Sequence, residues 1–155
     1  MGSPLTGFLY AASKDLSALE VLRRDSAREH AEAIAFHSQQ AAEKLLKNVF
    51  LENGIPAPRT HDLVHLIELA QGQGWLTCTR EEIEAAMALS DYAVAARYEF
   101  SPEIGEGEAL QAIAFCKRIA QLVARNGFPS AEVASTTHLL RDDSKDGDSE
   151  TSCGH

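Results

Sequence analysis

The sequence predicts an all-α fold, an up-and-down bundle of four to five helices with a short helix in the 62–71 region. Valine and isoleucine are few and never alternate with polar residues, as they would in a half-buried strand. Apolar residues recur instead at spacings of three and four, which place them on one face of a helix. The chain has 155 residues, 45% hydrophobic and 24% charged, a composition typical of one globular domain.

The first two helices are expected at 4–23 and 26–52. The first carries a stripe spaced 4, 3, 4 and 3, made of Leu5, Leu9, Ala12, Leu16 and Leu19. The second has a main stripe of Ala31, Ile34, Ala41, Ala42, Leu45 and Val49, and Phe36, Leu46 and Phe50 lie off it. A helix that is apolar on several sides is buried on several sides. We therefore expect it to be either the centre of the bundle or half of a dimer interface.

Capping signals delimit the remaining helices. Asn53-Gly54 and Pro56 end the second helix, and Thr60 or His61 is the expected N-cap of the short helix at 62–71. Its inner face consists of Leu63, Leu66, Ile67 and Ala70. The fourth helix starts at a capping box, Thr79 to Glu82, and runs to 98, with an inner face of Ile83, Met87, Val94 and Arg97. The fifth spans 106–125 and carries Leu110, Ile113, Leu122 and Val123.

Charge and composition divide the chain into a helical domain at 4–127 and a tail at 128–155. The tail loses the apolar periodicity and is acidic, so we expect it to be disordered. From residue 129 onward it contributes −4 to the net charge of −9, which leaves an acidic body as well. An acidic body argues against broad DNA binding through a basic face, although a local basic pocket for one nucleotide or a short RNA stays possible.

The same features bear on location. No apolar run approaches the ~18 residues that span a bilayer, and no basic leader precedes the apolar residues near the N-terminus. The cysteines are three in number and far apart, at 78, 116 and 153. This spacing favours a reducing cytoplasm over a disulfide scaffold or a zinc site built from cysteine. A cytoplasmic protein is the expectation.

Two histidines in the 59–70 stretch raise the question of a metal. His61 and His65 have the i, i+4 spacing of a helical zinc pair, but there is no HExxH pattern and no evident third ligand. A capping histidine followed by a solvated one explains them better. The sequence also lacks a GxSxG elbow, a P-loop and a GxGxxG turn. We assign no metal, no cofactor and no catalytic residue.

Other polar residues form candidate binding positions. His37, Gln40 and Lys44 are spaced 3 and 4 on one flank of the second helix, a pattern that also occurs for solvation alone. Arg97 continues an apolar face, where it either satisfies the last carbonyls of the helix or binds an anion. The sequence leaves both interpretations open.

Several stretches together carry a family resemblance. "FHSQQAAEKLLKNVFLENGIPAPRTHDLVHLIELA", residues 36–70, and "ARYEF", residues 96–100, resemble the HEPN domain (higher eukaryotes and prokaryotes nucleotide-binding). The resemblance covers about residues 8–125. It implies a helical bundle, often homodimeric, with roles from nucleotide or RNA binding to metal-independent RNA cleavage in toxins. Many members work with a nucleotidyltransferase encoded beside them.

The resemblance is incomplete where nuclease members carry their active site. Those members have an Arg and, four to six residues later, a His in the late part of the bundle. Here the first histidine after Arg97 is His138, and Tyr98-Glu99 replaces the Tyr-Pro of the family's "ARYP" segment. We therefore expect a non-catalytic protein that binds a nucleotide or a short RNA as a homodimer.

The expected nucleotide site consists of His37, Gln40, Lys44, Arg59, His61, Arg97 and Tyr98. If the third and fourth helices are antiparallel neighbours, Arg59 and His61 approach Arg97, at a helix start that already suits an anion. Glu43 is the internal acid expected beside this cluster. Two alternatives remain. One is an RNase toxin with an atypical site, and the other is a purely structural interaction module, in which Arg59 and His61 brace the 53–60 loop against the second helix.

Overall fold

The computed structural model describes residues 7–95 and 104–128. This part of the chain contains five helices and no strand, so the all-α prediction is confirmed. The helices are α1 (Gly7–Ser26), α2 (Ala31–Glu52), α3 (Leu63–Gly72), α4 (Arg80–Ala95) and α5 (Glu106–Arg125). Residues 4–6 of the expected domain lie outside the described residues, as does the expected acidic tail apart from Phe128. None of the described helices combines the length and the apolar character needed to cross a membrane.

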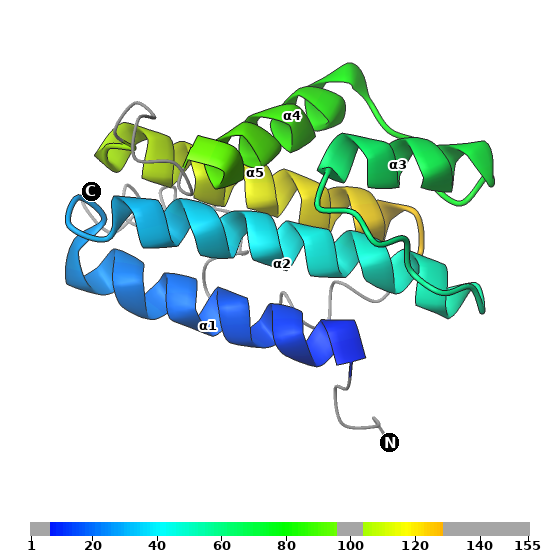
Figure 1. Ribbon diagram of the computed structural model, residues 1–155, viewed down its shortest axis with the longest axis horizontal. Coiled ribbons are helices and arrows are strands. Elements are labelled where there is room, and N and C mark those ends of the chain that lie inside the picture. The colour runs from blue at the N-terminus through cyan, green and yellow to red at the C-terminus, as the bar shows by residue number, and fades with distance from the viewer. Residues whose placement is uncertain (1–6, 96–103, 129–155) are drawn as a thin grey trace, which may run out of the picture.

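Helix α2 occupies the centre of the bundle and packs against each of the other four helices (Figure 1). α1 runs antiparallel to it on one side, while α5, α4 and the short α3 cover its other sides. This position explains why α2 is apolar around most of its circumference. Of the two expectations for this helix, the centre of the bundle is the one that the structure shows.

Side chains off the main stripe of α2 are covered mostly within one chain. Leu46 is 1% exposed and Phe50 is 4% exposed. Phe50 packs edge-on against Trp75, which follows α3, with ring centroids 5.2 Å apart. Phe36 differs, because it remains 37% exposed. Leu46 and Phe50 therefore give no reason to require a second subunit. Of these three side chains, Phe36 is the one that exposes apolar surface.

Most of the helix-end signals act as expected. Thr79 Oγ1 accepts from the Glu82 amide and Glu82 Oε1 accepts from the Thr79 amide, which confirms the capping box. Asn53-Gly54 ends α2, and Gly54 adopts a φ of +72°, which glycine tolerates without strain. The N-cap of α3 differs from the prediction: it is Asp62, not Thr60 or His61. The short Asp62 carboxylate reaches two free amides of the first turn, while the His61 ring turns toward α2.

The end of α1 and the start of α2 also differ from their predictions. α1 continues to Ser26, and a turn at 27–30 separates it from α2, which begins at Ala31 instead of residue 26. In this turn the His30 amide donates to the Ser26 carbonyl and the Glu29 amide donates to Ser26 Oγ. The Ser26 side chain thus belongs to the end of one helix, not to the start of the next.

The inner face of α4 agrees only in part with the predicted one, because Ile83 packs against the core but Met87 and Val94 do not. Its buried residues are Glu82, Ala85, Ala86, Leu89 and Ala93, whereas Met87 is 53% and Val94 54% exposed. Alanines allow α4 to approach α2 and α5 closely. Leu89 is buried with these alanines, whereas Met87 and Val94 point outward. Leu110, expected on the inner face of α5, is also exposed. Arg97 and Tyr98 lie outside the described residues.

Candidate functional site

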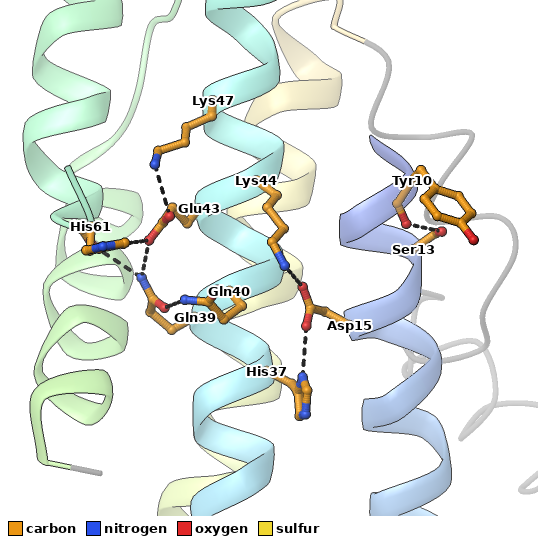
Figure 2. Close-up of polar contacts among 10 residues, drawn as sticks. All are labelled: Tyr10, Ser13, Asp15, His37, Gln39, Gln40, Glu43, Lys44, Lys47 and His61. Atoms are coloured by element: carbon orange, nitrogen blue, oxygen red, sulfur yellow. Dashed lines mark hydrogen bonds and ion pairs between the residues drawn. The ribbon is translucent and has the colours of Figure 1, made fainter. Parts of the chain in front are cut away.

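Polar side chains gather on two opposite flanks of α2, each around one buried carboxylate (Figure 2). The Asp15 cluster, between α1 and α2, consists of Asp15, His37 and Lys44. The Glu43 cluster, between α2 and the segment before α3, consists of Gln39, Glu43, Lys47 and His61. The geometry of each cluster indicates whether its residues are free to meet a ligand.

In the Asp15 cluster, one carboxylate holds two groups of the neighbouring helix. Asp15 Oδ1 lies 2.8 Å from His37 Nδ1, and Asp15 Oδ2 accepts from Lys44 Nζ at 2.5 Å. Asp15 is buried, whereas His37 and Lys44 remain partly exposed. These contacts engage both oxygens of the carboxylate and connect α1 to α2. The charge of Lys44 is therefore already paired within the fold.

In the Glu43 cluster, three donors converge on one buried carboxylate. Glu43 Oε1 accepts from Gln39 Nε2 at 2.9 Å and lies 3.0 Å from His61 Nδ1. Glu43 Oε2 lies 3.1 Å from Lys47 Nζ. Burial alone would raise the pKa of Glu43, but the hydrogen bonds from Gln39, His61 and Lys47 outweigh it and lower that pKa. Glu43 is thus a carboxylate at neutral pH.

The cluster also fixes the segment that leads into α3. Gln39 Nε2 donates to the His61 carbonyl at 3.2 Å, and Gln40 Nε2 donates to Gln39 Oε1 at 2.7 Å. His61 is held by its backbone and by its ring. This contact is the one expected if the protein is a structural interaction module in which His61 braces the 53–60 loop against α2. Arg59, the other brace expected there, is exposed and makes no hydrogen bond or ion pair with the rest of the described chain.

The expected site residues do not all converge. His37 and Lys44 face α1, while His61 lies on the α3 flank, and Gln40 contacts the second group through Gln39 (Figure 2). The position of Arg97 beside Arg59 and His61 falls outside the described residues. The acid nearest His61 is Glu43, as expected, and within the described ranges its cationic partner is Lys47.

The start of α3 lies beside the second half of α4, as antiparallel packing predicts. The Leu63 amide donates to Ser90 Oγ of α4 at 3.2 Å. The Val64 and His65 amides donate to Asp62 Oδ1 at 3.0 and 3.3 Å. The free amides that made this helix start attractive for an anion are therefore satisfied by the protein itself, and a carboxylate occupies the anion position.

A cleft opens between these two helices, and we call it the α3–α4 cleft. Its volume is about 510 Å³. Its walls are mainly apolar, with His61, Asp62, Ser90 and Asp91 as polar members. The described residues that line it are His61, Asp62, Val64, Met87, Ser90, Asp91, Ala93 and Val94. The exposed Met87 and Val94 thus belong to a hollow, which accounts for the outward apolar face of α4. Of the expected site residues, His61 lines this cleft.

Metal ligation is possible at a different place. Asp25, Glu29 and His30 hold ligand atoms within 4.8 Å of one another at the α1–α2 turn. This group does not include His61 or His65, the pair that has zinc-like spacing in the sequence. It is largely exposed, and His30 Nε2 already lies 2.6 Å from Asp25 Oδ2.

Asp15 was not expected as a buried partner, although the sequence carries a signal for it. Asp15 follows Ala12 by three residues and precedes Leu19 by four, so it falls on the inward stripe of α1. An acid at such a position requires a basic partner on the facing helix. His37 and Lys44, which were identified as a polar flank, are those partners.

Comparisons with known proteins agree with this fold. The chain is similar to TT1696 from Thermus thermophilus, whose crystal structure matches with a TM-score of 0.65 and 24% sequence identity. The match covers 77% of this chain and 94% of that one, and it supports the fold alone. No curated protein matches the sequence. The family model described as "HEPN domain" matches residues 7–126, which include all five helices, and the chain therefore belongs to the HEPN domain family.

Proposed function

We propose that this HEPN-domain protein is a non-catalytic binding module for a nucleotide or a short RNA, which enters the α3–α4 cleft. The observation that carries the proposal is the cleft itself. Its volume of about 510 Å³ and its apolar walls with a few polar groups match the usual character of small-molecule sites. Apolar walls suit the faces of a base, and the polar groups at the start of α3 supply hydrogen bonds.

A binding role agrees better with the sequence than RNA cleavage does. No histidine follows Arg97 at the distance found in nuclease members. Within the described residues, two carboxylates near the cleft are tied into the fold: Glu43 is held by three donors and Asp62 caps α3. The part of the chain that the structure describes therefore supplies no geometric feature that favours RNA cleavage.

Thermal melting and isothermal titration with ATP, GTP and short RNAs test the proposal. A ligand that binds the folded state must raise its melting temperature. Val94→Glu places a charge in the cleft at a position that is already exposed, so it should abolish binding and leave the fold intact. Val21→Glu, on the exposed face of α1 away from the cleft, is the matched control and should bind normally. Absence of any ligand effect at millimolar concentration in the unmodified protein would overturn the proposal.

A protein-interaction module is the second candidate, and the bracing of His61 favours it. The Glu43 cluster fixes the segment before α3 through His61, which is a structural role. Under this hypothesis the cleft accepts an apolar side chain of a partner such as a nucleotidyltransferase. Co-elution with a nucleotidyltransferase encoded beside this chain, lost in Val94→Glu and insensitive to ATP, would favour this function over nucleotide binding.

The proposal includes a homodimer and a cytoplasmic location. Phe36, exposed on the central helix, supports the dimer because a large aromatic side chain there gains by burial against a second copy. Sedimentation at micromolar concentration should give twice the monomer mass, and Phe36→Ser should shift the protein toward monomer. A monomer in both samples would overturn the dimer. Free thiols at Cys78 and Cys116 support a reducing compartment.

A further inference from the structure

The polar groups of the α3–α4 cleft are mainly hydrogen-bond acceptors. Two carboxylates, Asp62 and Asp91, line it, and none of the described lining residues is a lysine or an arginine. A phosphate placed there would meet two negative charges at close range, and no described residue of the lining offers a cation to offset them. Hydroxyl and amino groups, by contrast, donate hydrogen bonds to carboxylates and gain strength from the charge.

The backbone offers a phosphate no compensation. The amides of Leu63, Val64 and His65 already donate to Ser90 and to Asp62. An incoming phosphate would have to displace the Asp62 carboxylate from the end of α3 and then remain beside it. The usual helix N-terminal site for phosphate is therefore closed in this protein.

His61 adds one more acceptor at the edge of the cleft. Its Nδ1 lies 3.0 Å from the ionised Glu43 carboxylate, which can only accept, so Nδ1 carries the proton in this contact. In the neutral ring Nε2 then holds a lone pair. The Glu43 cluster thus positions His61 to accept a hydrogen bond through its other nitrogen.

Asp91 is the carboxylate of the cleft with its oxygens available. Asp62 Oδ1 accepts two amide hydrogen bonds, whereas Asp91 is exposed and has no hydrogen bond or ion pair with other described residues. A carboxylate with both oxygens free is the group that proteins commonly use to hold neighbouring ribose hydroxyls. Asp91 therefore suits the 2′,3′-diol of a terminal ribonucleoside.

We infer that the cleft binds the nucleoside end of its ligand, with Asp91 accepting from the ribose 2′,3′-hydroxyls and the phosphates directed to solvent. This inference rests on the proposed nucleotide or RNA function and narrows it to one part of the ligand. A free nucleotide and the 3′ end of an RNA both present this chemistry. An internal nucleotide of an RNA does not, because its 3′-oxygen is esterified.

Isothermal titration with adenosine, ATP and 2′,3′-dideoxyadenosine at low and high salt tests the inference. We expect adenosine and ATP to bind within about threefold of each other with little salt dependence, because no phosphate contact releases counterions. Loss of the diol should weaken binding roughly tenfold, the usual size of a lost hydrogen bond to a charged group. A short RNA with a free 3′-hydroxyl should bind, and the same RNA with a 3′-phosphate should not. Binding of adenosine without this RNA would assign the site to free nucleosides and nucleotides.

Asp91→Ala tests the assigned residue, with Glu68→Ala on the exposed side of α3 as the control for net charge and helix propensity. Asp91→Ala should weaken adenosine roughly tenfold and leave dideoxyadenosine unchanged, because the two changes remove the same contact. Equal weakening of both ligands, or ATP binding more than tenfold tighter than adenosine with strong salt dependence, would overturn the inference and leave nucleotide binding intact. Failure of every ligand to bind would overturn the proposed function with it.

Discussion

Replacement of Glu43 by alanine should destabilise the fold more than replacement of any exposed acid. Glu43 is 5% exposed and its carboxylate joins α2 to the segment before α3 through His61 and to Lys47 along α2. The largest loss is the countercharge of Lys47, whose side chain is itself mostly buried. Breaking a buried ion pair by removing one partner costs about 3–5 kcal/mol.

Two features reduce the expected cost. Lys47 can turn its ammonium toward water along its flexible stem. His61 is largely exposed and can exchange its bond to Glu43 for one to water, while Gln39 keeps its bond to the His61 carbonyl. We therefore expect a loss of about 2–4 kcal/mol in the free energy of unfolding. In a chain of this length, that loss lowers the melting temperature by roughly 10 °C.

Urea unfolding followed by far-ultraviolet circular dichroism measures this loss, with thermal melting as a second readout. Glu84→Ala is the matched control, because Glu84 forms an exposed i, i+4 ion pair with Arg80 and should cost less than about 1 kcal/mol. Glu43→Gln should fall between the two, since an amide still accepts one hydrogen bond but leaves Lys47 without a countercharge. A Glu43→Ala protein within about 1 kcal/mol of the unmodified one would refute the structural role of the cluster.

Three further outcomes are expected. The hydrogen bond from Arg125 is the main cause that lowers the pKa of Glu82. Burial would raise the pKa of Glu43, but its hydrogen bonds outweigh burial and lower it. The contribution of each carboxylate to the free energy of unfolding is therefore complete above the ordinary pKa of 4.5, and it is lost as the pH falls through the lowered pKa. Urea unfolding between pH 3 and 6 should show this loss, and a double Gln variant of the two acids should show a flatter profile. Burial raises the pKa of Cys116 to about 12, so iodoacetamide at pH 8 should modify this thiol in urea and spare it in the folded protein, as peptide mass analysis would show. Truncation before Pro129 should leave the melting temperature nearly unchanged, and a drop of many degrees would mean that the acidic tail packs on the bundle.

Local signals in the sequence were sufficient for most of the fold. The Thr79–Glu82 capping box, the Asn53-Gly54 ending of α2 and the inner face of α3 are all found where the sequence places them. Each depends on residues within one or two turns, so no knowledge of the partners of the helix is required. The apolar pattern of α2 limited its place to the centre of the bundle or a dimer interface, and its contacts with the four other helices show the central position.

The inner face of α4 could not be obtained in this way. The larger apolar residues Met87 and Val94 defined one face in the sequence, while the structure buries alanines and Leu89 on another. Which face turns inward depends on how closely α2 and α5 approach, and that distance is a tertiary property. Met87 and Val94, the residues assigned wrongly to the inner face, line the α3–α4 cleft. Exposed apolar patches often mark binding sites.

The contacts of the candidate residues follow only partly from the sequence. Glu43 was expected as the internal acid beside His61, and the structure places the two side chains in contact. Which flank each side chain faces depends on the rotation of α2 relative to α1 and α3. In the structure His37 and Lys44 contact Asp15 on the α1 flank of α2. His61 contacts the opposite flank of α2 through Gln39.

Asp62 and a phosphate would compete for the same amides at the start of α3. Under the proposed function, this competition determines which part of a ligand the α3–α4 cleft can recognise. A helix start with free amides attracts phosphate, and Arg59 and His61 precede it in the sequence, so a phosphate site was the natural expectation. In the fold, Asp62 reaches those amides first and brings its own negative charge with it. The same segment is held against α2 by the Glu43 cluster through the backbone and the ring of His61. The cleft that remains beside it is apolar and rich in acceptors, and Asp91 lines it. Under the proposed function, such a site would distinguish ligands by the hydroxyl and amino groups they donate, not by their charge.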